Sequence, residues 1–156
     1  MKKPDSLRAI LRSAIPQLKR DPEKLHIFLD EGNIIATAAN TLSFEYQYIL
    51  NAIVTDFEGH PDTLIVPILD WLRVNQPEMM LNRDKMRDGF TFEAEILNTK
   101  TADISIKLRL TERIAVNDDP ATGKRIIKHL DEPALDPYAE VEKWQLIIHG
   151  EVVQTT

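Results

Sequence analysis

The chain has 156 residues, no cysteine and a net charge of −6 at pH 7, and its length is that of one ordinary domain. The lack of cysteine excludes thiol catalysis and cysteine-based metal sites, and it suits a reducing compartment. Residues 1–78 carry 8 basic and 11 acidic side chains and residues 79–156 carry 11 and 14, so neither half has the basic excess of a dedicated nucleic-acid surface. We expect neither a membrane span nor a signal peptide, because no apolar run approaches about 18 residues and charges interrupt the N-terminal segment.

An opening helix is predicted over residues 5–19, with Asp5 or Ser6 as its N-cap. Its apolar stripe consists of Leu7, Ile10, Leu11, Ala14, Ile15 and Leu18. Pro16 lies almost opposite this stripe, where water could satisfy the carbonyl group that a proline frees. We therefore predict one bent helix, and a helix that ends at Ala14 is the alternative.

Three segments with the alternation of β-strands follow the opening helix. Residues 24–30 and 34–39 flank the sequence Glu31-Gly32-Asn33, which predicts a short hairpin turn. Residues 43–57 form the longest β-like run, and apolar residues on both of its faces predict a strand in the sheet interior. Because this run is long for one strand, we expect a bend or a bulge within it.

The second main helix is predicted over residues 61–76, where Pro61 suits the first helical position and Pro77 ends the helix. Its apolar stripe consists of Leu64, Ile65, Ile68, Leu69, Trp71 and Leu72. Thr63 and Pro67 fall on the other side, which we expect to face solvent. A stripe of this width needs a broad surface to cover, and the neighbouring strands can provide that surface.

The second half of the chain contains further strands. Residues 89–98 and 102–116 alternate strongly and predict a hairpin around the turn at 98–101. Residues 117–124 predict a second turn, and residues 125–129 predict a short return strand.

The end of the chain leaves two alternatives open. Residues 131–143 are acidic, contain two prolines and predict a surface tether. Residues 144–154 predict a last strand, which pairs either with the chain's own sheet or with a neighbouring subunit. We thus expect one α+β domain over residues 1–130, and residues 131–156 either belong to it or are exchanged with a neighbour. The predicted fold is a mixed or antiparallel sheet of about six to seven strands, packed against the two main helices at 5–19 and 61–76.

Three patterns resemble chemical sites without satisfying their requirements. Asp56, Glu58, His60 and Asp62 alternate along the chain, but the helix that starts there needs caps and negative charge, so capping explains them better than a cation. Residues 121–125 lack the first glycine and the Ser/Thr of a phosphate-binding loop and predict a turn instead. The four histidines have no HExxH spacing, although a triad assembled in space would leave no such signal. We predict no catalytic residue, no metal and no cofactor.

Three blocks of the sequence, in order, carry a family resemblance. They read KKPDSLRAIL…AIPQLKRDPEKLHIFLDEG, LSFEYQYILNAIVTDFEGHPDTLIVPILDWLRVNQPE and FEAEILNTKTADISIKLRLTERIAV. Over residues 2–116, including the strings FEY, VTDFEGHPD and LRLTER, the chain resembles the tail completion protein R family of P2-like contractile-tailed bacteriophages.

This resemblance implies a structural virion protein rather than an enzyme. Members of the family complete the phage tail and look like tail terminators, which cap the head-proximal end of the tube and sheath and prepare it for head joining. Terminators are typically homohexameric rings of small α+β subunits. The implied partners are further copies of the chain, the tail tube and sheath proteins and the head–tail connector protein, with no membrane and no sequence-specific nucleic acid. The implied location is the head-proximal end of the virion tail, after assembly in the cytoplasm of the host bacterium.

Subunit contacts are expected from the predicted turns and from the final segment. The candidates for charged contacts are Arg113, Asp118, Asp119 and Lys124. Tyr138 and Trp144 are candidate apolar anchors, because interfaces favour aromatic side chains. Each of these residues could equally be ordinary surface or core. Another structural subunit, associated with the tail tube or sheath, is the alternative function, and a small-molecule enzyme is a more distant one.

Overall fold

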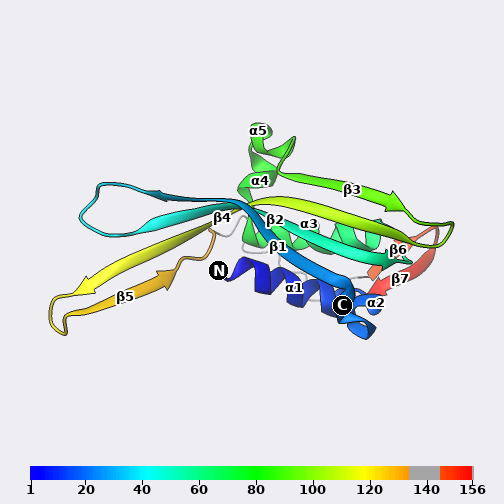
Figure 1. The fold of residues 1–156 in the computed structure, drawn as a ribbon, viewed down its shortest axis with the longest axis horizontal. Helices are drawn as coiled ribbons and strands as arrows, with labels where there is room; N and C mark the ends of the chain where they lie inside the picture. The colour runs from blue at the N-terminus through cyan, green and yellow to red at the C-terminus, as the bar shows by residue number, and fades with distance from the viewer. Residues whose placement is uncertain (134–144, 156) are drawn as a thin grey trace.

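The computed structural model describes residues 1–133 and 145–155, and its largest element is a five-stranded antiparallel sheet (Figure 1). The strands are β1 Leu25–Ala36, β2 Phe44–Phe57, β3 Phe90–Ile96, β4 Ala102–Asp119 and β5 Lys124–His129. Their order is β1-β2-β4-β3, and β5 pairs with the part of β4 that lies beyond the end of β3. The predicted α+β class is confirmed, and the hairpin between β3 and β4 is confirmed with it.

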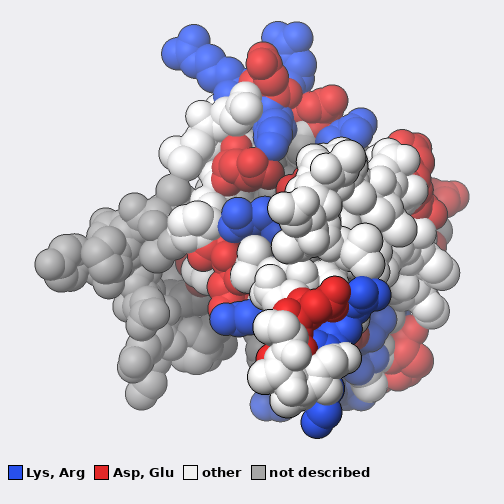
Figure 2. Space-filling view, turned by 90° about the vertical axis from the view of Figure 1, so that its left-hand side faces the viewer, with Lys and Arg blue, Asp and Glu red and all other residues white. Residues whose placement is uncertain are grey.

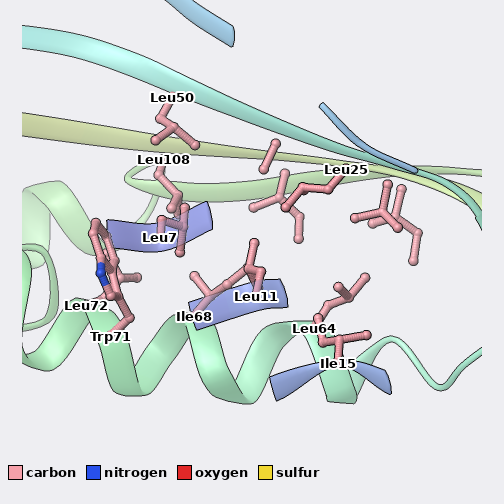
Figure 3. Packing of buried hydrophobic residues seen from close by; sticks show 14 of the residues in the cluster. Leu7, Leu11, Ile15, Leu25, Leu50, Leu64, Ile68, Trp71, Leu72 and Leu108 are labelled. Atoms are coloured by element: carbon pink, nitrogen blue, oxygen red, sulfur yellow. The ribbon is translucent and has the colours of Figure 1, made fainter. Parts of the chain in front are cut away.

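Helices cover one face of this sheet (Figure 1). They are α1 Lys3–Ala14, α2 Pro16–Arg20, the 3-10 helix η1 Pro22–Lys24 and α3 Asp62–Asn75. Two short helices between α3 and β3, α4 Glu78–Leu81 and α5 Arg83–Met86, project at the top of Figure 1. Figure 3 shows the resulting core, in which Leu50 and Leu108 of the sheet point toward Leu7, Leu11 and Ile68 of α1 and α3. All five of these side chains are fully buried. This burial of apolar area is the main stabilising contribution to the fold.

Strand β2 lies in the sheet interior between β1 and β4, as its two apolar faces predict. The expected irregularity is also present, because the pairing with β4 shifts register between Val54 and Phe57. Asp56 at this point has a φ of 50°, a conformation that L residues adopt mainly at bulges and turns. The buried face of β2 therefore continues to Phe57, which also belongs to the core.

The prediction of one continuous helix over residues 5–19 is wrong, and the alternative with a break after Ala14 holds. Ile15 has extended backbone angles, with φ −105° and ψ 113°, because the ring of Pro16 disfavours helical angles in the residue before it. Pro16 instead begins α2, where its missing N–H costs no hydrogen bond. The break turns the chain so that both Ile15 and Leu18 reach the core.

The predicted hairpin turn at Glu31-Gly32-Asn33 is also wrong, since β1 runs through this segment as one strand. The pairing of β1 with β2 shifts register between Asp30 and Asn33, and Glu31 has a φ of 50°. These residues therefore form a bulge. The chain reverses later, at residues 37–43, because the long β2 continues to offer hydrogen-bonding partners to β1.

Helix α3 matches its predicted range closely, but three of its residues lie on a different side from the one predicted. Thr63 and Pro67 are buried, whereas Leu69 is exposed. The reason is that α3 packs against α1 as well as against the sheet, so its buried side is wider and rotated relative to the apolar stripe. Pro67 therefore faces protein and not water.

The last strand predicted over residues 144–154 is a hairpin of two strands, β6 Gln145–Ile148 and β7 Glu151–Thr155. His149 and Gly150 both have positive φ, 51° and 84°, which is the geometry of a tight two-residue turn. The hairpin forms its own two-stranded sheet and is not part of the five-stranded one. Gln154 attaches it to the helical layer by donating a hydrogen bond of 2.7 Å from Nε2 to the carbonyl of Ala14. Most of the predicted tether, from residue 134 onward, lies outside the described residues.

Gly89 connects α5 to β3 at a point where no side chain fits. A Cβ atom added there would collide with the carbonyl oxygen of Lys85 and would lie 2.7 Å from Cγ of the buried Met79. We expect Gly89→Ala to lower the free energy of unfolding by about 2 kcal/mol, because the backbone or the core must shift. Gly32→Ala is the matched control, since nothing lies within 4 Å of its Cβ position. Urea denaturation measures the free energy of unfolding of the two variants, and equal values for them would contradict the prediction.

Candidate assembly interface

Two hairpins extend beyond the part of the sheet that the helices cover (Figure 1). We call residues 31–47 the β1–β2 arm and residues 114–129 the β4–β5 arm. Ile34, Leu42 and Ile127 are apolar but largely exposed on these arms. Exposed apolar side chains that gather in one region mark interaction surfaces. The arms are therefore a candidate for an assembly interface.

The two arms differ in charge. The loop at the end of the β1–β2 arm, residues 37–43, contains no charged residue. The end of the β4–β5 arm carries both signs. Figure 2 looks onto the ends of the arms and shows a cluster of red and blue atoms at the lower front, within a mostly white surface. A partner would therefore meet uncharged residues at the end of the β1–β2 arm and charged residues at the end of the β4–β5 arm.

The charges near the end of the β4–β5 arm organise its turn. Arg125 donates to both carboxylate oxygens of Asp118, with distances of 2.6 and 3.1 Å. Asp119 accepts hydrogen bonds from the backbone N–H of Ala121 and from the hydroxyl of Thr122. The bond from Arg125 holds the pKa of Asp118 below its ordinary value, and the bond from Thr122 does the same for Asp119. Both carboxylates therefore have local partners in the subunit.

The structure brings four of the six sequence-predicted interface residues onto one arm and its base. Asp118 and Asp119 end β4, and Lys124 begins β5 directly opposite Asp119. Arg113 is exposed on the same strand, opposite Glu45 of β2. Tyr138 and Trp144 lie outside the described residues.

A buried carboxylate, Glu112, lies at the base of the β4–β5 arm. Its oxygens accept hydrogen bonds from the backbone N–H groups of Lys2 and Lys3 and from the hydroxyl of Tyr48, at 2.7 to 3.0 Å. Burial alone would raise the pKa of Glu112, but these hydrogen bonds outweigh it and hold the pKa below its ordinary value. Nδ1 of His129 lies 3.4 Å from the same carboxylate. Glu112 thus joins the N-terminus, β2, β4 and the end of β5.

The side chain of Lys3 continues this network. Its Nζ donates to Oε1 of Gln76, to the carbonyl of Thr111 and to Oε1 of Glu132, at 2.7, 2.6 and 3.2 Å. Burial lowers the pKa of Lys3, while the charges of Glu132, Glu112 and Glu78 act in the opposite direction. Gln76 is itself buried and also accepts a hydrogen bond from the backbone N–H of Thr111. We call Lys3, Gln76, Thr111, Glu112 and Glu132 the polar junction.

The polar junction was not predicted from the sequence, although β4 carries one signal of it. Every second residue of β4 from Ile104 to Val116 faces the core, and Glu112 is the only charged residue among them. A single carboxylate in an apolar face requires buried partners. Those partners come from distant parts of the chain, so no local pattern reveals them.

Two comparisons with known proteins bear on what this architecture is for. The family described as P2 phage tail completion protein R (GpR) matches residues 1–133. The chain is 48% identical to tail completion protein R of Escherichia phage P2 over 153 residues, which are 98% of this chain and 97% of that protein. The chain belongs to the tail completion protein R family. It is therefore a structural protein of a phage tail, and the match reaches well beyond the blocks at residues 2–116. No solved structure matches it.

In this member of the family, the alternating acidic and histidine residues at the start of α3 do not assemble a metal site among the described residues. His60 lies 3.7 Å from Asp62, and no group of three His, Asp or Glu side chains is placed to hold a metal ion there. The backbone carbonyl of His60 accepts a hydrogen bond from the hydroxyl of Thr63, at the start of α3. None of the described helices combines the length and the apolar character needed to cross a lipid bilayer.

Proposed function

We propose that this protein terminates the phage tail as a homohexameric ring. The ring caps the head-proximal end of the tube and sheath and presents the surface that the head–tail connector protein binds. Assembly takes place in the cytoplasm of the host bacterium, and the ring remains in the virion. The partners are further copies of the chain, the tube and sheath proteins and the connector, without a membrane or a sequence-specific nucleic acid.

The observation that carries this proposal is the 48% identity to a tail completion protein over almost the whole length of both chains. The arms support it, because a subunit of a ring needs a surface that a self-contained protein does not. They expose Ile34, Leu42 and Ile127 beyond the helix-covered core. Burying such side chains against a neighbour contributes about 25 cal/mol for each Å² of apolar area.

A ring subunit stops tail growth for a geometric reason. Each ring of a growing tail exposes the surface that the next ring needs, and a terminator binds this surface without reproducing it on its far side. In a closed ring, each subunit presents one patch to the next subunit and its complement to the previous one. No patch then remains unpaired around the circle.

The charged residues of the β4–β5 arm are the proposed contacts within this ring. Arg113 and Lys124 have no ion-pair partner among the described residues, so they are available to a neighbour. Asp118 and Asp119 also hold their own turn, so they fix the shape of the arm that a neighbour would contact. Tyr138 and Trp144 remain proposed apolar anchors on the strength of residue type alone.

The experiment combines solution size with the response of tails. Light scattering of the purified protein should give a discrete ring mass that does not grow with concentration. Added to phage tails that lack the protein, it should appear by electron microscopy at the head-proximal end only and allow heads to join. A protein that stays monomeric and ignores tail ends would contradict the proposal. Growth into long polymers, or decoration along the tail, would favour a tube or sheath-associated subunit instead.

A further inference from the structure

Both margins of the five-stranded sheet end in strands with an unpaired edge. Strand β1 forms one margin, and β3 and β5 share the other, on the far side of β4. In the part of the chain that the structure describes, no further strand pairs with these edges. An open edge presents a row of backbone N–H and C=O groups that can pair with another chain. The sheet can therefore be extended from both sides.

The directions of the strands determine how one copy can extend another. Each strand in the series β1, β2, β4 and β5 is antiparallel to the next, so β5 and β1 run in opposite directions. Strand β5 lies level with β4 residues 114–119 and β1 lies level with residues 104–114. A second copy placed alongside, without being turned end for end but shifted along the strands toward the ends of the arms, brings its β1 next to β5 of the first. The new pair is then antiparallel and continues the alternation of the sheet.

The charges of the two margins are complementary at the arms. Strand β5 contains Lys124, Arg125 and Lys128 and no acidic residue, whereas β1 contains Asp30 and Glu31 and no Lys or Arg. Arg125 is paired with Asp118, but the other four form no ion pair with any described residue. Unlike charges on the two edges favour their approach.

The same comparison excludes β3 as the preferred partner of β1. Strand β3 contains Glu93 and Glu95 and no basic residue. Like charges on directly opposed strands are destabilising. Strand β1 of a neighbour, with its own two carboxylates, would be repelled by β3 and attracted by β5.

Both edges also carry exposed apolar side chains that a pairing would cover. Ile34 and Ile35 of β1 are 68% and 47% exposed, and Ile126 and Ile127 of β5 are 55% and 63% exposed. Adjacent isoleucines point to opposite faces of a strand, so a joined sheet would bring apolar neighbours together on both faces. Natural sheet edges that remain open usually avoid such residues.

We infer that β5 of one subunit pairs antiparallel with β1 of the next copy of this chain. The sheet then continues from subunit to subunit around the ring, and each contact uses two different edges, as a closed head-to-tail ring requires. This inference rests on the proposed function, because it specifies how the proposed ring is held together.

Disulfide cross-linking tests the inference, and the natural chain contains no cysteine that would interfere. The first double variant carries Ile35→Cys and Ile126→Cys in the same chain. Two further double variants, Asn33→Cys with Ile126→Cys and Ile35→Cys with Lys128→Cys, test neighbouring registers of the same strand pair. All four positions project from one face of the sheet. Within a subunit, β1 and β5 are about 14 Å apart, three strand spacings, which is too far for a disulfide. The matched control joins Ile35→Cys with Glu93→Cys on β3.

Mild oxidation should give a ladder of covalent oligomers up to the ring size for at least one β1–β5 pair. The single cysteine variants and the β3 control should give none. The edge pairing would be overturned if rings form but no β1–β5 pair gives a ladder, or if the β3 control gives one. Either result would leave the proposal of a ring standing. Failure of the unmodified protein to assemble, even on tail ends, would overturn the proposed function and this inference together.

Exchange of charges gives a second and independent test. Lys124→Glu combined with Lys128→Glu should raise the concentration needed for ring assembly about tenfold, because β5 then carries a net negative charge, as β1 does. Adding Asp30→Lys and Glu31→Lys to the same chain should restore it. The matched control, Glu93→Lys with Glu95→Lys, should leave assembly unchanged. Absence of rescue by the second exchange would overturn the pairing.

Discussion

Glu112→Gln should lower the free energy of unfolding by about 3 kcal/mol, measured by urea denaturation, because it removes a buried charge that several donors require. The carboxylate is only 4% exposed and accepts hydrogen bonds from Lys2, Lys3 and Tyr48. An amide has one oxygen instead of two, so at least one of these donors loses its acceptor. Glu93→Gln, at an exposed position of β3, is the matched control and should have little effect.

The same residue predicts a dependence of stability on pH. Because the folded-state pKa of Glu112 lies below its ordinary value of 4.5, its stabilising contribution is present above about pH 4.5 and is lost as the pH falls through the folded pKa. The natural protein should therefore lose stability on acidification below pH 4.5 more steeply than Glu112→Gln does. Parallel acid profiles for the two proteins would contradict the role assigned to this carboxylate.

Trp71→Ala should lower the free energy of unfolding by about 4 kcal/mol, because it leaves a large cavity between α3, α1 and the sheet. Trp71 is 2% exposed, and its Nε1 donates a hydrogen bond of 2.9 Å to the hydroxyl of Ser6 on α1. The indole thus links the two main helices both by packing and by a hydrogen bond. Thermal unfolding followed by circular dichroism measures the loss.

The hydrogen bond and the packing of Trp71 can be separated. Trp71→Phe keeps most of the buried aromatic area, so it should lower the free energy of unfolding by less than half as much as Trp71→Ala does. Ser6→Ala removes the acceptor alone and should cost about 1 kcal/mol. If the hydrogen bond matters, Ser6→Ala should have almost no further effect in a Trp71→Phe background. A Trp71→Ala variant as stable as Ser6→Ala would show that α3 is not held to α1 in this way.

The sequence analysis predicted most elements of the fold because their patterns are local. The alternation of β2 and β4 identified their buried faces, and the stripe on α3 identified its contact with the core. Two local signals pointed the wrong way. Glu31-Gly32-Asn33 has the composition of a turn, yet β1 continues through it because β2 is long enough to pair with it on both sides. Pro67 is buried, and α3 packs against α1 as well as against the sheet, which no pattern within α3 could indicate.

The candidate interface could be predicted only in part. The turn between β4 and β5 follows from its composition, so its charged residues were identified from the sequence. The exposure of Ile34 and Ile127 could not be predicted from the sequence, because an alternating strand has the same pattern whether or not a helix covers its end. The polar junction was missed for a related reason, since Glu112 lies more than 100 residues from Lys2 and Lys3.

The long separation in the polar junction has a consequence for synthesis of the protein. The backbone N–H groups of Lys2 and Lys3 donate to Glu112, so the start of α1 lacks these acceptors until β4 has left the ribosome. During translation, α1 can pack against α3 before then, but its core is complete only when β4 adds Leu108 and its neighbours. A polypeptide that ends before β4 would lack both the acceptor for the N-terminus and the central part of the sheet, so we expect it not to enter tail assembly.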